Sequence, residues 1–201
     1  MRRGRQPARL AVLTGAALAA FGLAYLGMAQ GFFRGPYPPL GKRLAWVLGV
    51  PGPAYNFGVV IPGQIFRSAR PDAHFLTWLK QEHGVQRVVS LDGESEVHAV
   101  ARSLGLKVSS FRWRVESLPP EAELRAALDL ISSGERVLVH CASGSDRTGY
   151  TVAAHRVLRE GWPTERALAE MRRYWHKREL HPAVEAGLLA LFTLGGVPRP
   201  G

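Results

Sequence analysis

The chain has 201 residues, of which 46% are hydrophobic, and a net charge of +10. This length and composition suffice for one well-packed core and argue against two independent domains. The single cysteine excludes an internal disulfide, and it supplies too few thiols for a cysteine-based zinc site. The thiol must therefore serve either packing or reactivity.

The charge is distributed unevenly along the chain. All sixteen acidic residues lie at or beyond Asp72, whereas the first 71 residues carry nine basic residues. This balance suits an anionic partner, such as a phosphate ester, a nucleic acid or lipid head groups. In the C-terminal half the basic residues are interspersed with glutamates, which is typical of a solvated surface. Because no motif supports nucleic-acid binding, we expect no nucleic-acid partner.

The N-terminal region begins with a basic tail, residues 1–9, which is followed by an uncharged apolar stretch, residues 10–29. A helix of this length spans about 30 Å, which is the thickness of the hydrocarbon core of a bilayer. The stretch therefore predicts a transmembrane helix, with a cleaved signal peptide as the alternative. More basic residues precede the stretch than follow it, so the positive-inside rule places the N-terminus in the cytoplasm and the rest of the chain in the periplasm.

Residues 30–63 contain six prolines and seven glycines, a composition that predicts a linker. From residue 64 onward the patterns predict alternating short strands and helices. We expect strands at 64–68, 85–91, 106–114 and 136–140, and helices at 72–84, 94–105, 120–134, 148–160, 164–178 and 181–194. This order is typical of an α/β fold with a central, largely parallel sheet flanked by helices. We therefore assign residues 64–195 to one domain and residues 196–201 to a C-terminal tail.

The sequence "VLVHCASGSDRTGY", residues 137–150, places the only cysteine between a predicted strand and a glycine-bearing loop. A strand, a loop and a helix in this order direct backbone N–H groups and a helix N-terminus at one point, which favours a bound anion. The same groups would stabilise a thiolate, so Cys141 is the candidate nucleophile. The residues expected to surround the anion are Ala142, Ser143, Gly144, Ser145, Asp146 and Arg147.

Three further residues of this loop have expected roles. The planar guanidinium of Arg147 matches two oxygens of a phosphoryl group. Gly144 allows the backbone to approach the anion closely. The hydroxyl of Thr148 can donate to the cysteine sulfur and make it a better leaving group.

The loop resembles the His-Cys-x5-Arg-Thr loop of the cysteine-dependent phosphatases, the protein tyrosine and dual-specificity phosphatase superfamily. The matching residues are His140, Cys141, Gly144, Arg147 and Thr148, and the similarity is greatest to the compact bacterial branch. The resemblance implies a central sheet flanked by helices and a two-step reaction in which Cys141 takes the phosphoryl group and water releases it. It implies no metal and no cofactor, and a structural role for His140 in supporting the loop.

The reaction also needs a proton donor for the leaving oxygen, and the sequence offers three carboxylates. Glu116 precedes Pro119 and Pro120, as in the Asp-x-x-Pro-Pro loop of the phosphoinositide phosphatases. Asp146 lies inside the cysteine loop, as in the myotubularin-like lipid phosphatases. Asp92 follows the predicted strand 85–91. As candidates for the proton donor, Glu116 and Asp146 rank equally, and Asp92 ranks below them.

We therefore expect a membrane-anchored phosphatase that acts on a phosphorylated protein. The alternative substrate is a lipid or inositol phosphate, and the choice depends on the depth of the site. Two other hypotheses stay open: a catalytically silent phosphate-binding module, which would lack a working acid, and a redox-sensing thiol.

Overall fold

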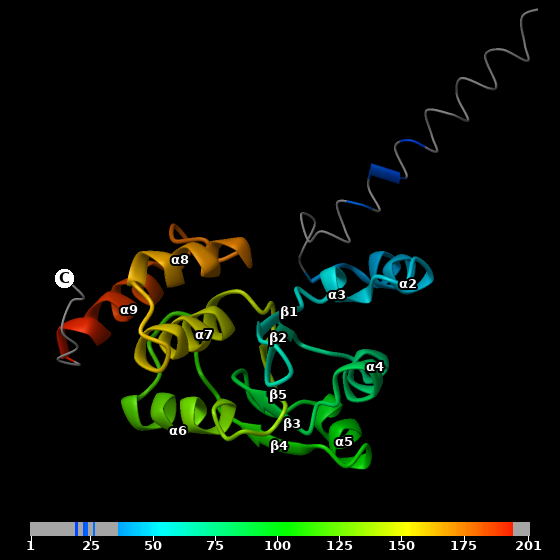
Figure 1. Cartoon of the computed structure of the whole chain (residues 1–201), viewed down its shortest axis with the longest axis horizontal. Helices are drawn as coiled ribbons and strands as arrows, with labels where there is room; N and C mark the ends of the chain where they lie inside the picture. The colour runs from blue at the N-terminus through cyan, green and yellow to red at the C-terminus, as the bar shows by residue number, and fades with distance from the viewer. Residues whose placement is uncertain (1–18, 20–21, 24–25, 27–35, 195–201) are drawn as a thin grey trace, which may run out of the picture.

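A five-stranded sheet forms the centre of the computed structural model, which describes residues 19, 22, 23, 26 and 36–194 (Figure 1). The strands lie in the order β1-β2-β5-β3-β4, and only the edge strand β1 runs antiparallel to its neighbour. Their bounds are Gly58–Ile61 (β1), Ile65–Ala69 (β2), Arg87–Ser90 (β3), Lys107–Ser110 (β4) and Val137–Cys141 (β5). The predicted α/β fold is confirmed, with a mixed sheet.

Helices cover both faces of the sheet (Figure 1). One face packs against α4 (Ala73–His83) and α5 (Glu96–Ser103), and the other packs against α6 (Glu121–Ile131) and α7 (Asp146–Leu158). Two more helices, α8 (Thr164–Arg173) and α9 (Pro182–Leu194), pack against α7. Side chains of the central strand β5 alternate between the two cores, because successive residues of a strand point to opposite faces. Val139 and Cys141 face the α6–α7 side, and Leu138 faces the α4–α5 side.

The boundaries of α4 follow the capping signals in the sequence. The Asp72 side chain accepts a hydrogen bond from the Phe75 N–H, which is the interaction expected of an N-cap. Gly84 ends the helix in the left-handed conformation, with a φ of 62°. The helix predicted over 164–178 is shorter in the structure, because the chain leaves helical geometry at Tyr174 and Trp175 has a φ of 70°.

The region expected to be a linker contains regular structure from residue 39 onward. Helices α2 (Pro39–Val47) and α3 (Pro51–Ala54) both begin with proline, whose fixed φ suits the first turn of a helix. Strand β1 then pairs with β2, and Tyr55 is buried in the core on the α4 side. The prediction of a linker rested only on the proline and glycine content of residues 30–63. The packed part of the chain starts before residue 64.

The expected membrane location depended on residues 10–29, most of which lie outside the described residues. Within the described part of the chain, no helix combines the length and the apolar character needed to cross a bilayer. The prediction of a membrane and periplasmic location is therefore corrected, because the described part of the chain gives no support to a transmembrane helix.

Candidate active site

Cys141 is the last residue of β5, the middle strand of the sheet, and only 1% of it is exposed. The neighbouring strands β2 and β3 run parallel to β5, so their carboxyl ends meet at the same edge of the sheet. Helix α7 starts five residues later at Asp146. The positive end of its dipole therefore points toward the loop that follows the cysteine. We call residues 141–147 the cysteine loop.

The carbonyl groups of the cysteine loop are held from outside the loop. Those of Ala142, Ser143 and Gly144 accept hydrogen bonds from the Arg70 N–H (3.2 Å), Asn56 Nδ2 (3.1 Å) and Arg67 Nη2 (2.7 Å), respectively. In a trans peptide the following N–H points away from the carbonyl. The N–H groups of Ser143 and Gly144 are therefore directed toward the inside of the loop, where they can bind an anion, whereas the Ser145 N–H donates to Ser143 Oγ at 3.4 Å.

Gly144 is required at its position for two reasons. Its φ is 71°, which favours glycine, and a Cβ atom there would lie 2.5 Å from the Ala69 nitrogen. The loop thus lies directly against the end of β2. The sequence analysis predicted that the backbone at Gly144 approaches an anion closely. In this structure the backbone at Gly144 closely approaches β2.

Arg147 and Thr148 lie in the first turn of helix α7 and carry polar atoms without a hydrogen-bond partner in the described part of the chain. Arg147 Nη1 donates to the Trp113 carbonyl at 3.0 Å, which orients the guanidinium. In the described part of the chain, buried Arg147 Nε and Thr148 Oγ1 have no hydrogen-bond partner. Buried polar atoms are rarely left unpaired, so these two atoms mark a place for a bound group.

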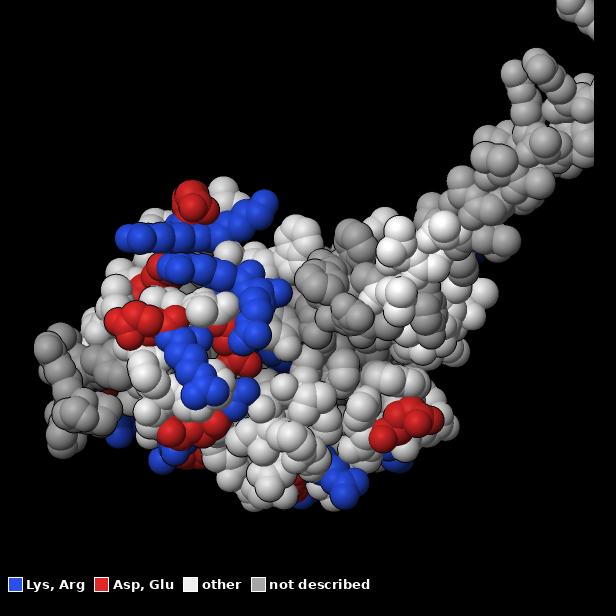
Figure 2. Space-filling view, turned by 45° about the horizontal axis from the view of Figure 1, so that its top comes forward, with Lys and Arg blue, Asp and Glu red and all other residues white. Residues whose placement is uncertain are grey.

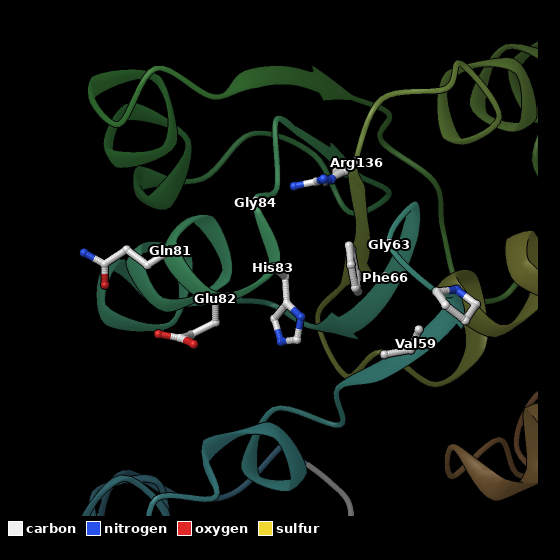
Figure 3. Close-up of a pocket in the computed structure, with 9 residues that line it drawn as sticks. Val59, Gly63, Phe66, Gln81, Glu82, His83, Gly84 and Arg136 are labelled. Carbon is white, nitrogen blue, oxygen red and sulfur yellow. The ribbon is translucent and has the colours of Figure 1, made fainter.

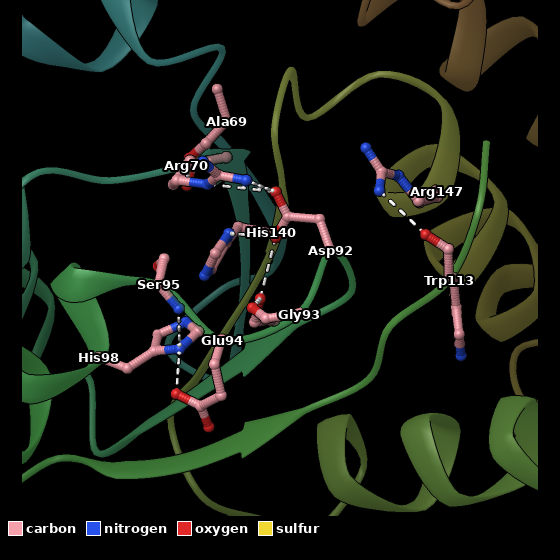
Figure 4. A network of polar contacts seen from close by, with 12 residues as sticks. Ala69, Arg70, Asp92, Gly93, Glu94, Ser95, His98, Trp113, His140 and Arg147 are labelled. Atoms are coloured by element: carbon pink, nitrogen blue, oxygen red, sulfur yellow. Dashed lines mark hydrogen bonds and ion pairs between the residues drawn. The ribbon is translucent and has the colours of Figure 1, made fainter.

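Asp92, at the end of β3, belongs to a polar network beside the cysteine loop (Figure 4). Its carboxylate accepts hydrogen bonds from Arg70 and from Ser90 Oγ (2.9 Å), and it lies 3.9 Å from His140 Nδ1. Burial alone would raise the pKa of Asp92, but these neighbours hold it below its ordinary value. Because Arg70 and Ser90 already donate to its two oxygens, Asp92 is a poor candidate for a proton donor. It supports Arg70, whose backbone N–H holds the loop.

His140 is completely buried on the α4–α5 side of β5. Burial lowers the pKa of its imidazole to about 4, although Asp92 opposes the shift. The ring is therefore neutral at physiological pH. This environment is consistent with the structural role that the resemblance implies.

The other two carboxylates differ in their surroundings. The Asp146 Oδ1 atom lies 2.7 Å from Nδ1 of buried His176, so this carboxylate is engaged by the segment between α8 and α9. Glu116 lies in the loop between β4 and α6, and its side chain is 67% exposed. A hydrogen bond from its own backbone, together with the nearby Arg114 and Arg147, lowers the pKa of Glu116. Glu116 is thus exposed, and it lies close enough to Arg147 for the charge of the guanidinium to lower its pKa.

Two residues that hold the site were not predicted from the sequence. Asn56 lies in the segment interpreted as a linker, and its φ of 50° cannot be read from the sequence. His176 lies 30 residues after Asp146, and no local pattern connects the two. The signal for Asn56 is weak: asparagine tolerates positive φ better than most residues do.

A hollow lies near the opposite ends of the parallel strands (Figure 3). It has a volume of about 450 Å³ and is lined by Val59, Gly63, Phe66, His83 and Arg136, among others. Arg136 precedes β5, whereas Cys141 ends it, so the length of the strand separates this hollow from the thiol. The hollow is therefore not the site of the cysteine chemistry.

The site has a buried thiol at the end of a central strand, backbone amides that face inward, and an arginine at the start of the next helix. This arrangement is that of the cysteine-dependent phosphatases. The profile of the tyrosine phosphatase family matches residues 52–193. The chain therefore belongs to the tyrosine phosphatase family.

Curated relatives include the dual specificity protein phosphatase TpbA of Pseudomonas aeruginosa. The protein of strain UCBPP-PA14 is 32% identical over 132 residues, which cover 64% of this chain and 58% of the relative. The protein of strain PAO1 is 32% identical over 130 residues. The chain thus spans less than two thirds of the length of these relatives.

Solved structures show the same fold. The crystal structure of P. aeruginosa TpbA matches with a TM-score of 0.61 and 26% identity over 69% of this chain and 86% of that chain. The catalytic domain of the PP-IP phosphatase SIW14 from S. cerevisiae matches with a TM-score of 0.54 and 20% identity over 72% of this chain and 95% of that chain. At that identity the second likeness shows the fold alone.

Proposed function

We propose that the protein is a phosphatase that hydrolyses phosphate monoesters through a cysteinyl-phosphate intermediate. The observation that carries this proposal is the cysteine loop, in which three consecutive carbonyls are bound from outside, so that the N–H groups of Ser143 and Gly144 face inward. This arrangement concentrates N–H donors around the Cys141 thiol, where three phosphoryl oxygens would lie.

In the first step, the Cys141 thiolate attacks phosphorus and the bond between phosphorus and the ester oxygen breaks. The inward amides and Arg147 bind the phosphoryl oxygens as charge spreads over them. The unpaired Nε of Arg147 supports this role, because it can donate to a phosphoryl oxygen while Nη1 keeps its bond to Trp113.

Glu116 is the proton donor that we propose for the leaving oxygen. Of the three carboxylates, Asp92 is held by Arg70 and Asp146 by His176, whereas Glu116 is exposed on a loop whose Trp113 carbonyl contacts Arg147. That loop closes a space of only about 10 Å³ beside Arg147, which is roughly the volume of one water. Glu116 is therefore the carboxylate that we propose can reach the ester oxygen of a bound substrate.

In the second step, water attacks the cysteinyl phosphate and the sulfur leaves as a thiolate. The buried Thr148 hydroxyl, which lacks a partner in the described residues, can donate to the sulfur and stabilise the developing charge. The deprotonated acid from the first step can accept a proton from the attacking water.

For the substrate, we propose a phosphorylated protein, because the related TpbA is a dual specificity protein phosphatase that has been crystallised with pTyr. One observation favours a second candidate, a lipid or inositol phosphate with several phosphates. Arg70, Arg112 and Arg114 lie at the same edge of the sheet as Cys141, and Arg112 and Arg114 are exposed. Such an arginine-rich edge suits a polyanion.

Turnover of p-nitrophenyl phosphate tests the enzymatic claim. We expect wild-type activity and no activity above background for Cys141→Ser. Equal activity of the two proteins would refute the mechanism, and phosphate binding without turnover would support the silent phosphate-binding module. Vanadate should inhibit regardless of earlier exposure to reductant, whereas activity governed by redox history would favour the redox-sensing thiol.

A substrate panel separates the two candidate substrates. It comprises phosphotyrosine and phosphoserine peptides, inositol polyphosphates and vesicles that contain phosphoinositides. A higher kcat/KM for the peptides supports the protein phosphatase. A higher kcat/KM for the inositol compounds supports the second candidate.

A further inference from the structure

Asp146, the first residue of α7, is bound by a histidine from a distant part of the chain. His176 is fully buried, and its Nδ1 atom lies 2.7 Å from Asp146 Oδ1. A carboxylate oxygen accepts hydrogen bonds, so a proton on Nδ1 can be donated to Asp146. The contact joins the segment after α8 to the end of the cysteine loop.

The pair belongs to a larger network of charged and titratable side chains, of which His176 and Glu185 are buried. His176 Nε2 lies 3.6 Å from a Glu185 carboxylate oxygen, and the side chains of His176 and Glu185 are 0% and 6% exposed. His181 Nε2 approaches the other oxygen of Asp146 at 3.8 Å. The remaining charged groups of the network are Arg172 and Arg178, which lie 3.1 and 3.7 Å from Glu185. The imidazole is thus held between two carboxylates.

The residues on either side of Trp175 contact the cysteine loop or the side chains that hold it. Asn56 Nδ2 donates to both the Ser143 and the Tyr174 carbonyls at 3.1 Å. Arg67, which binds the Gly144 carbonyl, lies 3.8 Å from the centre of the Tyr174 ring. Trp175, between Tyr174 and His176, has a φ of 70°, which is unfavourable for tryptophan. Such a conformation persists only where the surroundings hold it, so this segment is firmly anchored.

The direction of the Asp146 carboxylate matters because Arg147 is its neighbour in sequence. A carboxylate directed into the anion site would repel a phosphate dianion and compete with it for Arg147. We propose that His176 is a positioning residue, which holds Asp146 outside the anion site and so leaves Arg147 available to phosphate. This proposal rests on the proposed phosphatase function and deepens it.

Binding of inorganic phosphate to the full chain, measured by calorimetry, tests the proposal without depending on turnover. We expect His176→Ala to weaken phosphate binding by about tenfold or more, because the freed carboxylate can turn toward the anion. His176→Asn keeps an N–H donor near the Nδ1 position and should recover most of the affinity. Wild-type affinity in His176→Ala would overturn the proposal.

Removal of the Asp146 charge distinguishes a positioning role of His176 from a purely structural one, because the two roles predict opposite changes in phosphate affinity. In the His176→Ala background, Asp146→Asn should restore phosphate affinity, because the repelling charge is gone. If His176 only stabilised the fold, the second change would weaken binding further, and that result would overturn the proposal. If His176→Ala does not fold, Asp146→Asn alone decides: we expect phosphate affinity at least equal to that of the wild type, and weaker binding overturns the proposal.

Two controls separate this proposal from the proposed function. Glu170→Gln disturbs another buried ion pair, with Arg156 at 2.9 Å, and should leave phosphate affinity unchanged. A wild-type chain that binds phosphate but hydrolyses no ester would refute the phosphatase, while the binding series would still test His176. Loss of turnover in Asp146→Asn with full phosphate affinity, together with a flattened pH–rate limb, would show that Asp146 is the acid and would overturn the proposal.

Discussion

At the scale of single residues, His140 illustrates how burial sets a charge state. Its ring lies on the α4–α5 side of β5, 5.9 Å from the ring of His98, with Asp92 as the nearest carboxylate. Burial outweighs the attraction of Asp92, so the ring stays neutral and supports the cysteine loop without adding charge.

His140 predicts a loss of stability in mild acid. The unfolded chain takes up a proton at the ordinary pKa of 6.5, whereas the folded protein does so only at about 4. Between these values the unfolded state holds more protons, so the free energy of unfolding falls as the pH decreases, by about 1–2 kcal/mol between pH 6.5 and pH 5. Urea unfolding at several pH values should show a shallower dependence for His140→Asn. An equal dependence in both proteins would contradict the assignment.

Gly144 predicts a loss of both stability and activity when a methyl group is added. In Gly144→Ala the Cβ atom would clash with the backbone at Ala69, and the positive φ adds strain. We expect a loss of about 2 kcal/mol or more and a large decrease in kcat. The matched control is Gly134→Ala, which has a φ of 82° but no atom within 4 Å of the added Cβ. It should cost about 1 kcal/mol and leave kcat unchanged.

At the scale of elements, α7 is held by ion pairs as well as by apolar packing. Arg156 bonds Glu170 of α8 and Glu160, and it donates to the Val60 carbonyl of β1 at 2.8 Å. The side chains of Arg156 and Glu170 are only 8% and 9% exposed. This pair therefore joins two helices and the edge strand far from the thiol.

Removal of the charge of Glu170 should affect stability but not chemistry. Glu170→Gln leaves Arg156 with one carboxylate partner fewer, and we expect the free energy of unfolding to fall by about 1–3 kcal/mol. The kcat/KM for p-nitrophenyl phosphate should be unchanged at a temperature where the variant is folded. A decrease in kcat/KM there would show that this pair influences the cysteine loop.

The lowered pKa of Glu116, in the loop between β4 and α6, predicts how kcat/KM depends on pH. A general acid must be protonated to act, and the backbone, Arg114 and Arg147 lower the pKa of Glu116. We therefore expect kcat/KM to fall as the pH rises, beginning below neutrality. Glu116→Gln should reduce kcat and flatten this limb, whereas Asp92→Asn should leave its position unchanged. A limb that persists in Glu116→Gln would exclude Glu116 as the acid.

At the scale of the whole molecule, positive charge is in excess but is not segregated. On the face shown in Figure 2, basic side chains gather on the side of α8 and α9, with acidic side chains among them. Several basic side chains are paired with acidic ones, for example Arg172 with Glu185 and Arg159 with Asp129. The mixed surface agrees with the interspersed charges read from the sequence.

The net charge of +10 predicts a salt dependence that grows with the charge of the substrate. Long-range attraction is screened over about 10 Å at moderate ionic strength. We therefore expect added sodium chloride to lower kcat/KM for an inositol polyphosphate more steeply than for p-nitrophenyl phosphate. Equal slopes would show that the net charge does not influence substrate capture.

The sequence by itself determined the local features of the site. The order of residues from His140 to Thr148 defines the cysteine loop, because a strand, a tight glycine turn and a helix start are encoded within a few positions. The same holds for α4, whose bounds follow from Asp72 and Gly84. Strand β1 escaped prediction because it forms through pairing with β2, and helices α2 and α3 escaped it because their region is rich in proline and glycine.

Only the tertiary structure decided how the three carboxylates differ. In the sequence Asp92, Asp146 and Glu116 were alternatives, since the pKa of a carboxylate and the atoms it can reach depend on its neighbours in space. In the fold, Arg70 is hydrogen-bonded to Asp92 and His176 to Asp146, whereas Glu116 is exposed near Arg147. These contacts join residues that lie 22 to 31 positions apart, and so no local pattern could encode them.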